Sequence, residues 1–147
     1  ILAAAESAAA PAGRQVLGTG RGMVQTGQVI RGSCWTYASA VYKQAGFEGK
    51  SRTRPYKTKK AGPYADAEAL QPGDFLSYVN LQYKRGVHSA IFVAWLDRDA
   101  EEALMLSYVG SKRAQPGDYR SYTLSHVYMI QRPAMRSPPA DDVWDGG

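Results

Sequence analysis

The sequence contains a single cysteine, so the chain can form neither an internal disulfide nor a multi-cysteine metal cluster. Its two histidines, His88 and His126, have no neighbouring acidic residues that would complete a metal site. Carboxylates paired as in glycoside hydrolases are not evident. No apolar run approaches the roughly 20 residues needed to cross a bilayer. We therefore expect no metal, no cofactor and no membrane span.

The composition is that of a globular protein of one domain. The chain has 147 residues, of which 44% are hydrophobic and 21% are charged. Fifteen glycines, eight prolines and ten tyrosines favour short elements, many turns and prominent β-structure. We predict a monomer with one domain over residues 1–132 and a tail over 133–147.

The charge balance is basic, with 18 Lys and Arg against 13 Asp and Glu, a net charge of +5. Such a balance favours a polyanionic partner, which can be nucleic acid, an anionic lipid surface or the polymers of a bacterial wall. The cations crowd into residues 50–60, which form either a solvated loop or a patch that guides substrate. Because the chain carries no nucleic-acid signature such as a zinc knuckle, we expect no nucleic-acid partner.

Three zones follow one another along the chain. Residues 1 to about 46 have a helical pattern, and 47–73 form a basic connection that contains prolines. From residue 74 onward, runs rich in branched and aromatic residues predict successive strands. The predicted strands are Asp74–Val79, Val87–Leu96, Ala103–Val109 and Val127–Gln131.

The first residues leave two interpretations open. The chain begins with Ile, and Ala3–Ala10 is rich in alanine but lacks the basic start of an intact signal peptide. The segment is either what remains after signal cleavage or the start of an ordinary helix. We expect an exported protein, periplasmic or extracellular, whose signal peptide is not present in this chain.

The clearest predicted helix begins at Cys34. Ser33 is suited to cap its first turn, and Gly46 is well placed to end it. A cysteine at the first turn of a helix lies beside unpaired N–H groups and partial positive charge. Both favour the thiolate, which is the nucleophilic form, and the same N–H groups can hold an oxyanion.

A thiol nucleophile also needs a base, and His88 is the better candidate. His88 opens the strongest predicted strand, which would hold it rigidly, whereas His126 precedes a short one. Without further context, a lone cysteine is more often a small buried hydrophobe. A lone histidine at a strand edge is likewise more often structural or solvated.

The residues around Cys34 favour the catalytic interpretation over the structural one. Gly32-Ser33-Cys34-Trp35 resembles the nucleophile segment of papain-like peptidases, in which a glutamine stands six residues before the cysteine, as Gln28 does here. The short spacing to His88 resembles the compact bacterial branches, the NlpC-type peptidases and CHAP amidases. In those branches a Pro-Gly-Asp turn leads into a strand, as in Leu70–Phe75, and the histidine opens the next one, as in Gly86–Val93.

This resemblance implies an α+β fold. N-terminal helices, with the nucleophile at a helix start, would pack on an antiparallel β-sheet. It also implies a cysteine hydrolase that cleaves amide bonds through a thioester intermediate. The implied substrate is a peptide or an anionic, peptidoglycan-like polymer.

The resemblance further assigns roles to residues. Cys34 would be the nucleophile, His88 the base, and the Cys34 backbone N–H with the Gln28 side chain the oxyanion hole. Ser107 stands where these families carry the third residue, commonly His, Asn, Gln or Glu. A serine can accept a hydrogen bond from imidazole, although it cannot offset the charge of imidazolium. The candidates for substrate binding are Trp35, Lys57, Lys59 and Lys60.

Two other functions fit the same residues. One is a secreted papain-like effector, a deamidase, acyltransferase or protease, acting on a protein target. The other is a catalytically inactive binding module, for which Cys34 would be unreactive.

Overall fold

The computed structural model describes residues 1–108 and 114–135, which form a small α+β domain with helices packed on an antiparallel sheet. Most of the predicted tail, residues 136–147, lies outside the described residues. Three helices come first: α1 (Leu2–Ala8), α2 (Pro11–Gln25) and α3 (Cys34–Gln44). None of the helices in the described part of the chain is long and apolar enough to cross a membrane.

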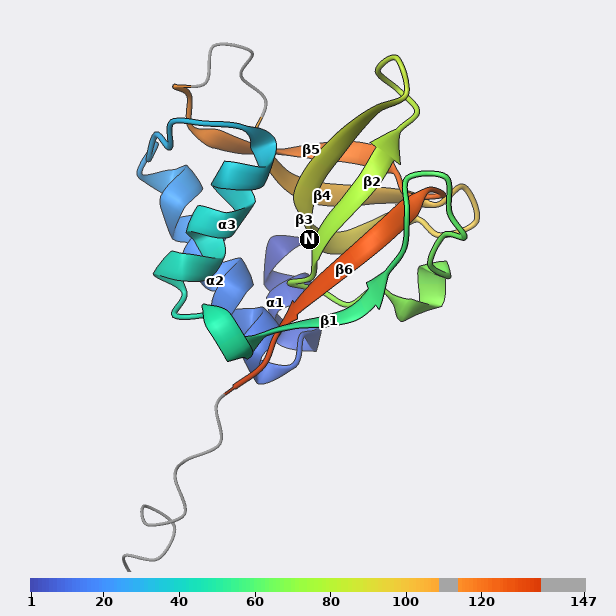
Figure 1. The fold of residues 1–147 in the computed structure, drawn as a ribbon. Helices are drawn as coiled ribbons and strands as arrows, with labels where there is room; N and C mark the ends of the chain where they lie inside the picture. The colour runs from blue at the N-terminus through green and yellow to red at the C-terminus, as the bar shows by residue number, and fades with distance from the viewer. Residues whose placement is uncertain (109–113, 136–147) are drawn as a thin grey trace, which may run out of the picture.

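Six strands follow, joined in part by the short 3-10 helices η1 (Gly49–Ser51) and η2 (Ala67–Ala69). The strands pair in the order β1-β6-β2-β3-β4-β5, and every pair is antiparallel (Figure 1). Their bounds are Arg52–Lys57 for β1, Phe75–Asn80 for β2, Gly86–Asp97 for β3, Glu102–Tyr108 for β4, Gly117–Thr123 for β5 and Val127–Pro133 for β6.

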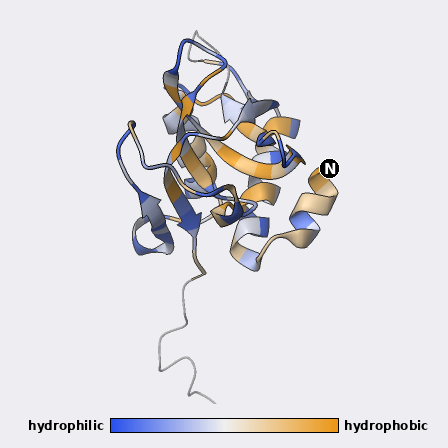
Figure 2. Ribbon diagram, turned by 90° about the vertical axis from the view of Figure 1, so that its right-hand side faces the viewer, coloured by the Kyte–Doolittle hydropathy of each residue, from blue (hydrophilic) through white to orange (hydrophobic). Residues whose placement is uncertain are grey.

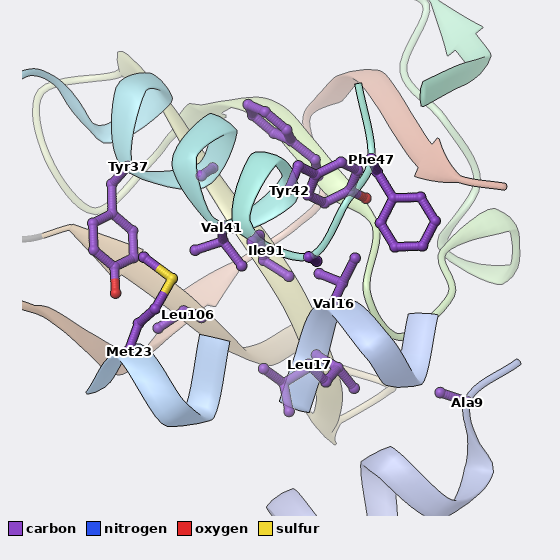
Figure 3. Close-up of a cluster of buried hydrophobic side chains, with 14 of the residues drawn as sticks. Ala9, Val16, Leu17, Met23, Tyr37, Val41, Tyr42, Phe47, Ile91 and Leu106 are labelled. Atoms are coloured by element: carbon purple, nitrogen blue, oxygen red, sulfur yellow. The ribbon is translucent and has the colours of Figure 1, made fainter. Parts of the chain in front are cut away.

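The two faces of the sheet bury two separate clusters. Phe75, Ile91 and Leu106 face the helices, and Figure 3 shows side chains of α2 and α3 packed on that side. The alternate residues, among them Tyr78 and Phe92, fill a second cluster on the opposite face. Hydrophobic residues accordingly gather in the facing strands and helices, and hydrophilic ones in the outer loops (Figure 2).

The sheet curves strongly around the second cluster. Two strands separate β2 from β5 in the pairing order, yet the rings of Tyr78 and Tyr122 lie only 5.8 Å apart. A flat sheet would hold strands in these positions about 14 Å apart at the usual spacing of roughly 4.8 Å. The curvature therefore brings side chains of β2, β3, β4 and β5 together.

The predicted elements are largely confirmed. The helix at Cys34 and the four strands predicted after residue 74 form, a fifth strand, β5, lies between the last two of them, and the alanine-rich start is helical in α1. The basic connection over 47–73 was predicted without a strand, and that was wrong, because β1 forms there as an edge strand paired with β6. Pro55 and exposed charges obscured it, but an edge strand tolerates a residue that donates no hydrogen bond.

A buried ion pair joins β2 to β6. Asp74 is fully buried and accepts two hydrogen bonds from Arg132, each of 2.8 Å, and a third from the backbone N–H of Gln71. This confirms the role of Asp74 as a turn residue and adds a cross-strand contact. Because a buried carboxylate without its partner is costly, the start of β2 depends on Arg132.

We predict that Arg132→Ala lowers the free energy of unfolding by about 3 kcal/mol or more, since it leaves the Asp74 charge buried and unpaired. Denaturant titration of both proteins measures this. Lys43→Ala is the control, because Lys43 and Glu48 form an exposed pair, 3.9 Å apart, that should contribute less than about 1 kcal/mol. Equal losses in the two variants would contradict the prediction.

Candidate active site

The turn before Cys34 is tightly specified. Ser33 caps α3 by accepting a hydrogen bond from the Thr36 backbone N–H, and the Thr36 hydroxyl accepts one from the Ser33 backbone N–H. Gly32 has φ of +133°, and a Cβ there would lie 2.7 Å from the Thr36 side chain. This reciprocal cap confirms the predicted helix start and places Cys34 at the first helical position.

The Cys34 thiol is partly buried. Its neighbour Trp35 stays 45% exposed while one side of the indole packs against Phe75, with ring centroids 5.6 Å apart. Trp35 is thus only partly packed against the core. The exposed remainder of the ring leaves its predicted contact with substrate open.

His88 and Ser107 are brought together as the sequence predicted. His88 Nε2 lies 2.8 Å from Ser107 Oγ, and Ser107 Oγ lies 3.2 Å from the Tyr122 hydroxyl. The Tyr122 ring also packs against the imidazole, with centroids 4.9 Å apart. If Nε2–H donates to Oγ, the Nδ1 lone pair remains available to accept a proton, which is the tautomer that a general base requires.

The surroundings keep His88 neutral. Burial lowers the pKa of His88 from 6.5 to about 4, because desolvation disfavours the imidazolium. Ser107 and the neighbouring tyrosines supply no negative charge to offset this effect. His88 is therefore a weak base that stays neutral near pH 7 and does not form half of a preformed ion pair.

The contacts of His88 do not include Cys34. Within residues 1–108 and 114–135, no hydrogen bond joins the thiol to the imidazole. Tyr78 is opposite His88 in the β2–β3 pairing, and their rings meet edge-on at 5.6 Å. Burial, Tyr122 and then Cys34 raise the pKa of Tyr78 well above its ordinary value.

The backbone arrangement places both ends of the predicted dyad at one end of the molecule. Figure 1 shows that α3 begins at the same end as the hairpin from which β3 starts. Helix α3 packs on β3 and β4, the strands that carry His88 and Ser107. This packing places the first turn of α3 and the start of β3 at one end of the domain, and the contact between Cys34 and His88 stays a prediction.

Gln28 lies in the loop between α2 and α3. Its backbone N–H bonds to the Met23 carbonyl, which extends the end of α2, and its side chain is partly buried. No hydrogen bond of the Gln28 amide to another described residue is present, so this side chain is not committed to a structural role there. Its part in an oxyanion hole stays a prediction.

The three candidate lysines are exposed, on β1 and just after it. The Thr58 backbone N–H bonds to the Tyr128 carbonyl at 2.7 Å, which places Lys57 and Lys59 beside β6. Burial and then Cys34 raise the pKa of Tyr128, the residue whose carbonyl accepts this hydrogen bond. The basic segment thus lies beside β6.

Sequence reasoning gave no role in the site to two aromatic residues. Neither Tyr78 nor Tyr122 is among the residues that the sequence predicts for the site. The alternation of β2 and β3 about their hairpin could have placed Tyr78 opposite His88. Tyr122 could not be found this way, because its approach depends on the curvature of the whole sheet.

Comparison with known proteins yields one distant structural relative. No family model matches the chain, and no curated protein matches it. Among solved structures, a wild-type endolysin, LysIME-EF1, is similar with a TM-score of 0.52 and 14% sequence identity. The match covers 85% of this chain and 65% of the endolysin, so this chain spans less than two thirds of that protein. At this identity the likeness concerns the fold alone.

We predict that His88 makes stability depend on pH. The unfolded state binds a proton near pH 6.5 and the folded state only near pH 4, so stability should fall as the pH drops through this window, by up to about 3 kcal/mol. Denaturant midpoints measured from pH 7.5 to 4 test this. His88→Gln should flatten that part of the profile, and an unchanged slope in the variant would contradict the assignment.

Proposed function

We propose that this chain is a cysteine hydrolase that cleaves amide bonds in bacterial cell-wall peptides through a thioester intermediate. The observation that carries the proposal is the hydrogen bond of His88 to Ser107 at the end of the sheet where α3 begins with Cys34. This hydrogen bond would orient the base that the proposal assigns to a nucleophile at a capped helix start.

In the proposed reaction, His88 Nδ1 takes the proton from Cys34 Sγ, and the thiolate attacks the amide carbonyl carbon. The oxyanion forms beside the Cys34 N–H and the Gln28 side chain, both of which can donate hydrogen bonds to it. The C–N bond then breaks, and His88 returns the proton to the departing amine. A water molecule, deprotonated by His88, hydrolyses the thioester and regenerates the thiol.

For this chemistry, the Cys34 thiol and the His88 imidazole must come within hydrogen-bonding distance. Catalytic hydrogen bonds are often long or absent in a free enzyme and tighten only when substrate is bound. The partly buried thiol and imidazole lie on elements packed against each other, so closure needs side-chain movement rather than a change of fold.

Two observations support the choice of substrate. The solved structure that this fold resembles is an endolysin, and endolysins are cell-wall hydrolases. The exposed Lys57, Lys59 and Lys60 follow the edge strand beside β6, where they would attract an anionic wall polymer. A substrate of this kind implies that the protein works outside the cytoplasm.

We predict that Cys34→Ala abolishes hydrolysis, with a loss on the order of 10³-fold or more, because no other group in the proposed site can form the thioester. The assay is the release of free amino groups from purified peptidoglycan. Circular dichroism and the denaturant midpoint of the variant should match those of the wild type.

Full activity of Cys34→Ala would remove this mechanism. If the wild type leaves peptidoglycan intact but its thiol reacts rapidly with iodoacetamide, the target is a protein rather than the wall. An inert thiol together with intact peptidoglycan indicates a binding module.

We also predict that Ser107→Ala lowers kcat by roughly tenfold to hundredfold, because the imidazole loses its orienting partner. The loss should be smaller in Tyr122→Phe, which keeps the hydrogen bond between His88 and Ser107. Ser51→Ala is the matched control, since Ser51 is equally buried but bonds to the Glu48 carbonyl at the start of β1. Equal effects of Ser107→Ala and Ser51→Ala would mean that Ser107 acts only through stability.

A further inference from the structure

The buried hydroxyl of Ser107 lies between three polar groups. Its oxygen is 2.8 Å from His88 Nε2, 3.2 Å from the Tyr122 hydroxyl and 3.4 Å from the Tyr108 carbonyl oxygen. Among the described residues, these three are its only hydrogen-bond partners. A serine hydroxyl has one proton to donate and two lone pairs that accept. The three neighbours therefore compete for a single proton.

The direction of that proton determines which nitrogen of His88 is free. Neutral imidazole carries its proton on one ring nitrogen and accepts at the other. If Ser107 donates to Nε2, the ring proton is on Nδ1, and no lone pair is left for a further proton. If Nε2–H donates to Ser107 Oγ, Nδ1 keeps its lone pair. The proposed reaction needs the second arrangement, because Nδ1 receives the thiol proton.

The same arrangement is needed after the proton transfer. An imidazolium carries protons on both nitrogens, so Ser107 Oγ must accept from Nε2–H and cannot donate to it. The burial that lowers the pKa of His88 would make an unpaired imidazolium N–H costly. Before and after the transfer, the Ser107 proton therefore needs an acceptor other than His88.

Tyr122 is the nearer of the two other acceptors. Most O–H···O hydrogen bonds are about 2.5–3.0 Å long, so the contact of 3.2 Å to Tyr122 is closer to a formed bond than that of 3.4 Å to the Tyr108 carbonyl. The Tyr122 ring packs against the imidazole, with centroids 4.9 Å apart, and β5 pairs with β4 on either side of these residues. These contacts hold the Tyr122 hydroxyl beside Ser107.

We propose that Tyr122 is a positioning residue for His88, whose hydroxyl oxygen accepts the Ser107 proton and thereby keeps Nε2–H of His88 donating to Ser107. The inference rests on the proposed function, since it concerns the base of that reaction. The O–H bonds of Ser107 and Tyr122 stay intact, and the only proton transferred is the one from Cys34 Sγ to His88 Nδ1. A Tyr122 hydroxyl that instead donated to Ser107 would direct the Ser107 proton to Nε2.

The tautomer of His88 reports this role without any substrate. The intact chain is isotope-labelled at its histidine nitrogens, and NMR near neutral pH distinguishes Nε2–H from Nδ1–H, with His88→Gln to assign the signals. The wild type should carry the proton mainly on Nε2. Tyr122→Phe keeps the ring but removes the acceptor, so the ratio of Nε2–H to Nδ1–H should fall roughly fivefold, the effect of one ordinary hydrogen bond.

Tyr78→Phe is the matched control. The Tyr78 ring meets the same imidazole edge-on at 5.6 Å, but its hydroxyl bonds to none of the described residues. Its removal should leave the tautomer ratio unchanged. A shift as large as that of Tyr122→Phe would mean that the ratio responds to general polarity around the ring, and the inference would be wrong.

A second comparison tests whether Tyr122 acts through Ser107. In a Ser107→Ala background, Tyr122→Phe should have no further effect on the ratio, because the two hydroxyls act in series. An effect that persists there would show that Tyr122 acts on the ring directly and would contradict the inference. So would a wild type with its proton mainly on Nδ1, or a ratio that rises in Tyr122→Phe.

Two results separate this inference from the proposed function. An unchanged ratio in Tyr122→Phe, with hydrolysis still lost in Cys34→Ala, overturns the role of Tyr122 alone. Hydrolysis that survives Cys34→Ala overturns the proposed function whatever the tautomer ratios are.

Discussion

The attachment of α3 to the start of β2 determines where the chain can hold Cys34. The Tyr42 hydroxyl donates to the Gly73 carbonyl at 2.5 Å, and its ring packs against Phe75 at 5.5 Å. The next residue after that glycine, Asp74, is bound by Arg132 of β6. Because these contacts are buried, the helix cannot slide along the sheet, and its first turn stays at the end where β3 begins.

The chemistry available at that end is limited by the absence of negative charge. An imidazole with a pKa of about 4 gains a proton only if the partner anion is well stabilised. A carboxylate behind the ring would stabilise the imidazolium, but Ser107 and Tyr122 are neutral there. In the proposed reaction, the stabilisation would therefore come from the sulfur side, through the helix start at Cys34.

Features that depend on residues close together in the sequence were easier to predict than contacts between distant segments. The cap of Ser33 is a local feature and was predicted from the residues around Cys34. Ser107 was placed through the resemblance, and strand alternation brings it to His88. Edge strand β1 was missed because its partner β6 lies far along the chain. The approach of Tyr122 depends on curvature, which no local pattern encodes.

The fold likeness and the site carry different kinds of information. A TM-score of 0.52 at 14% identity relates the architecture to an endolysin, and one fold can serve many chemistries. Function must therefore be argued from side chains. The side chains that meet at this end of the sheet are His88, Ser107 and Tyr122, and together they orient the imidazole without supplying negative charge.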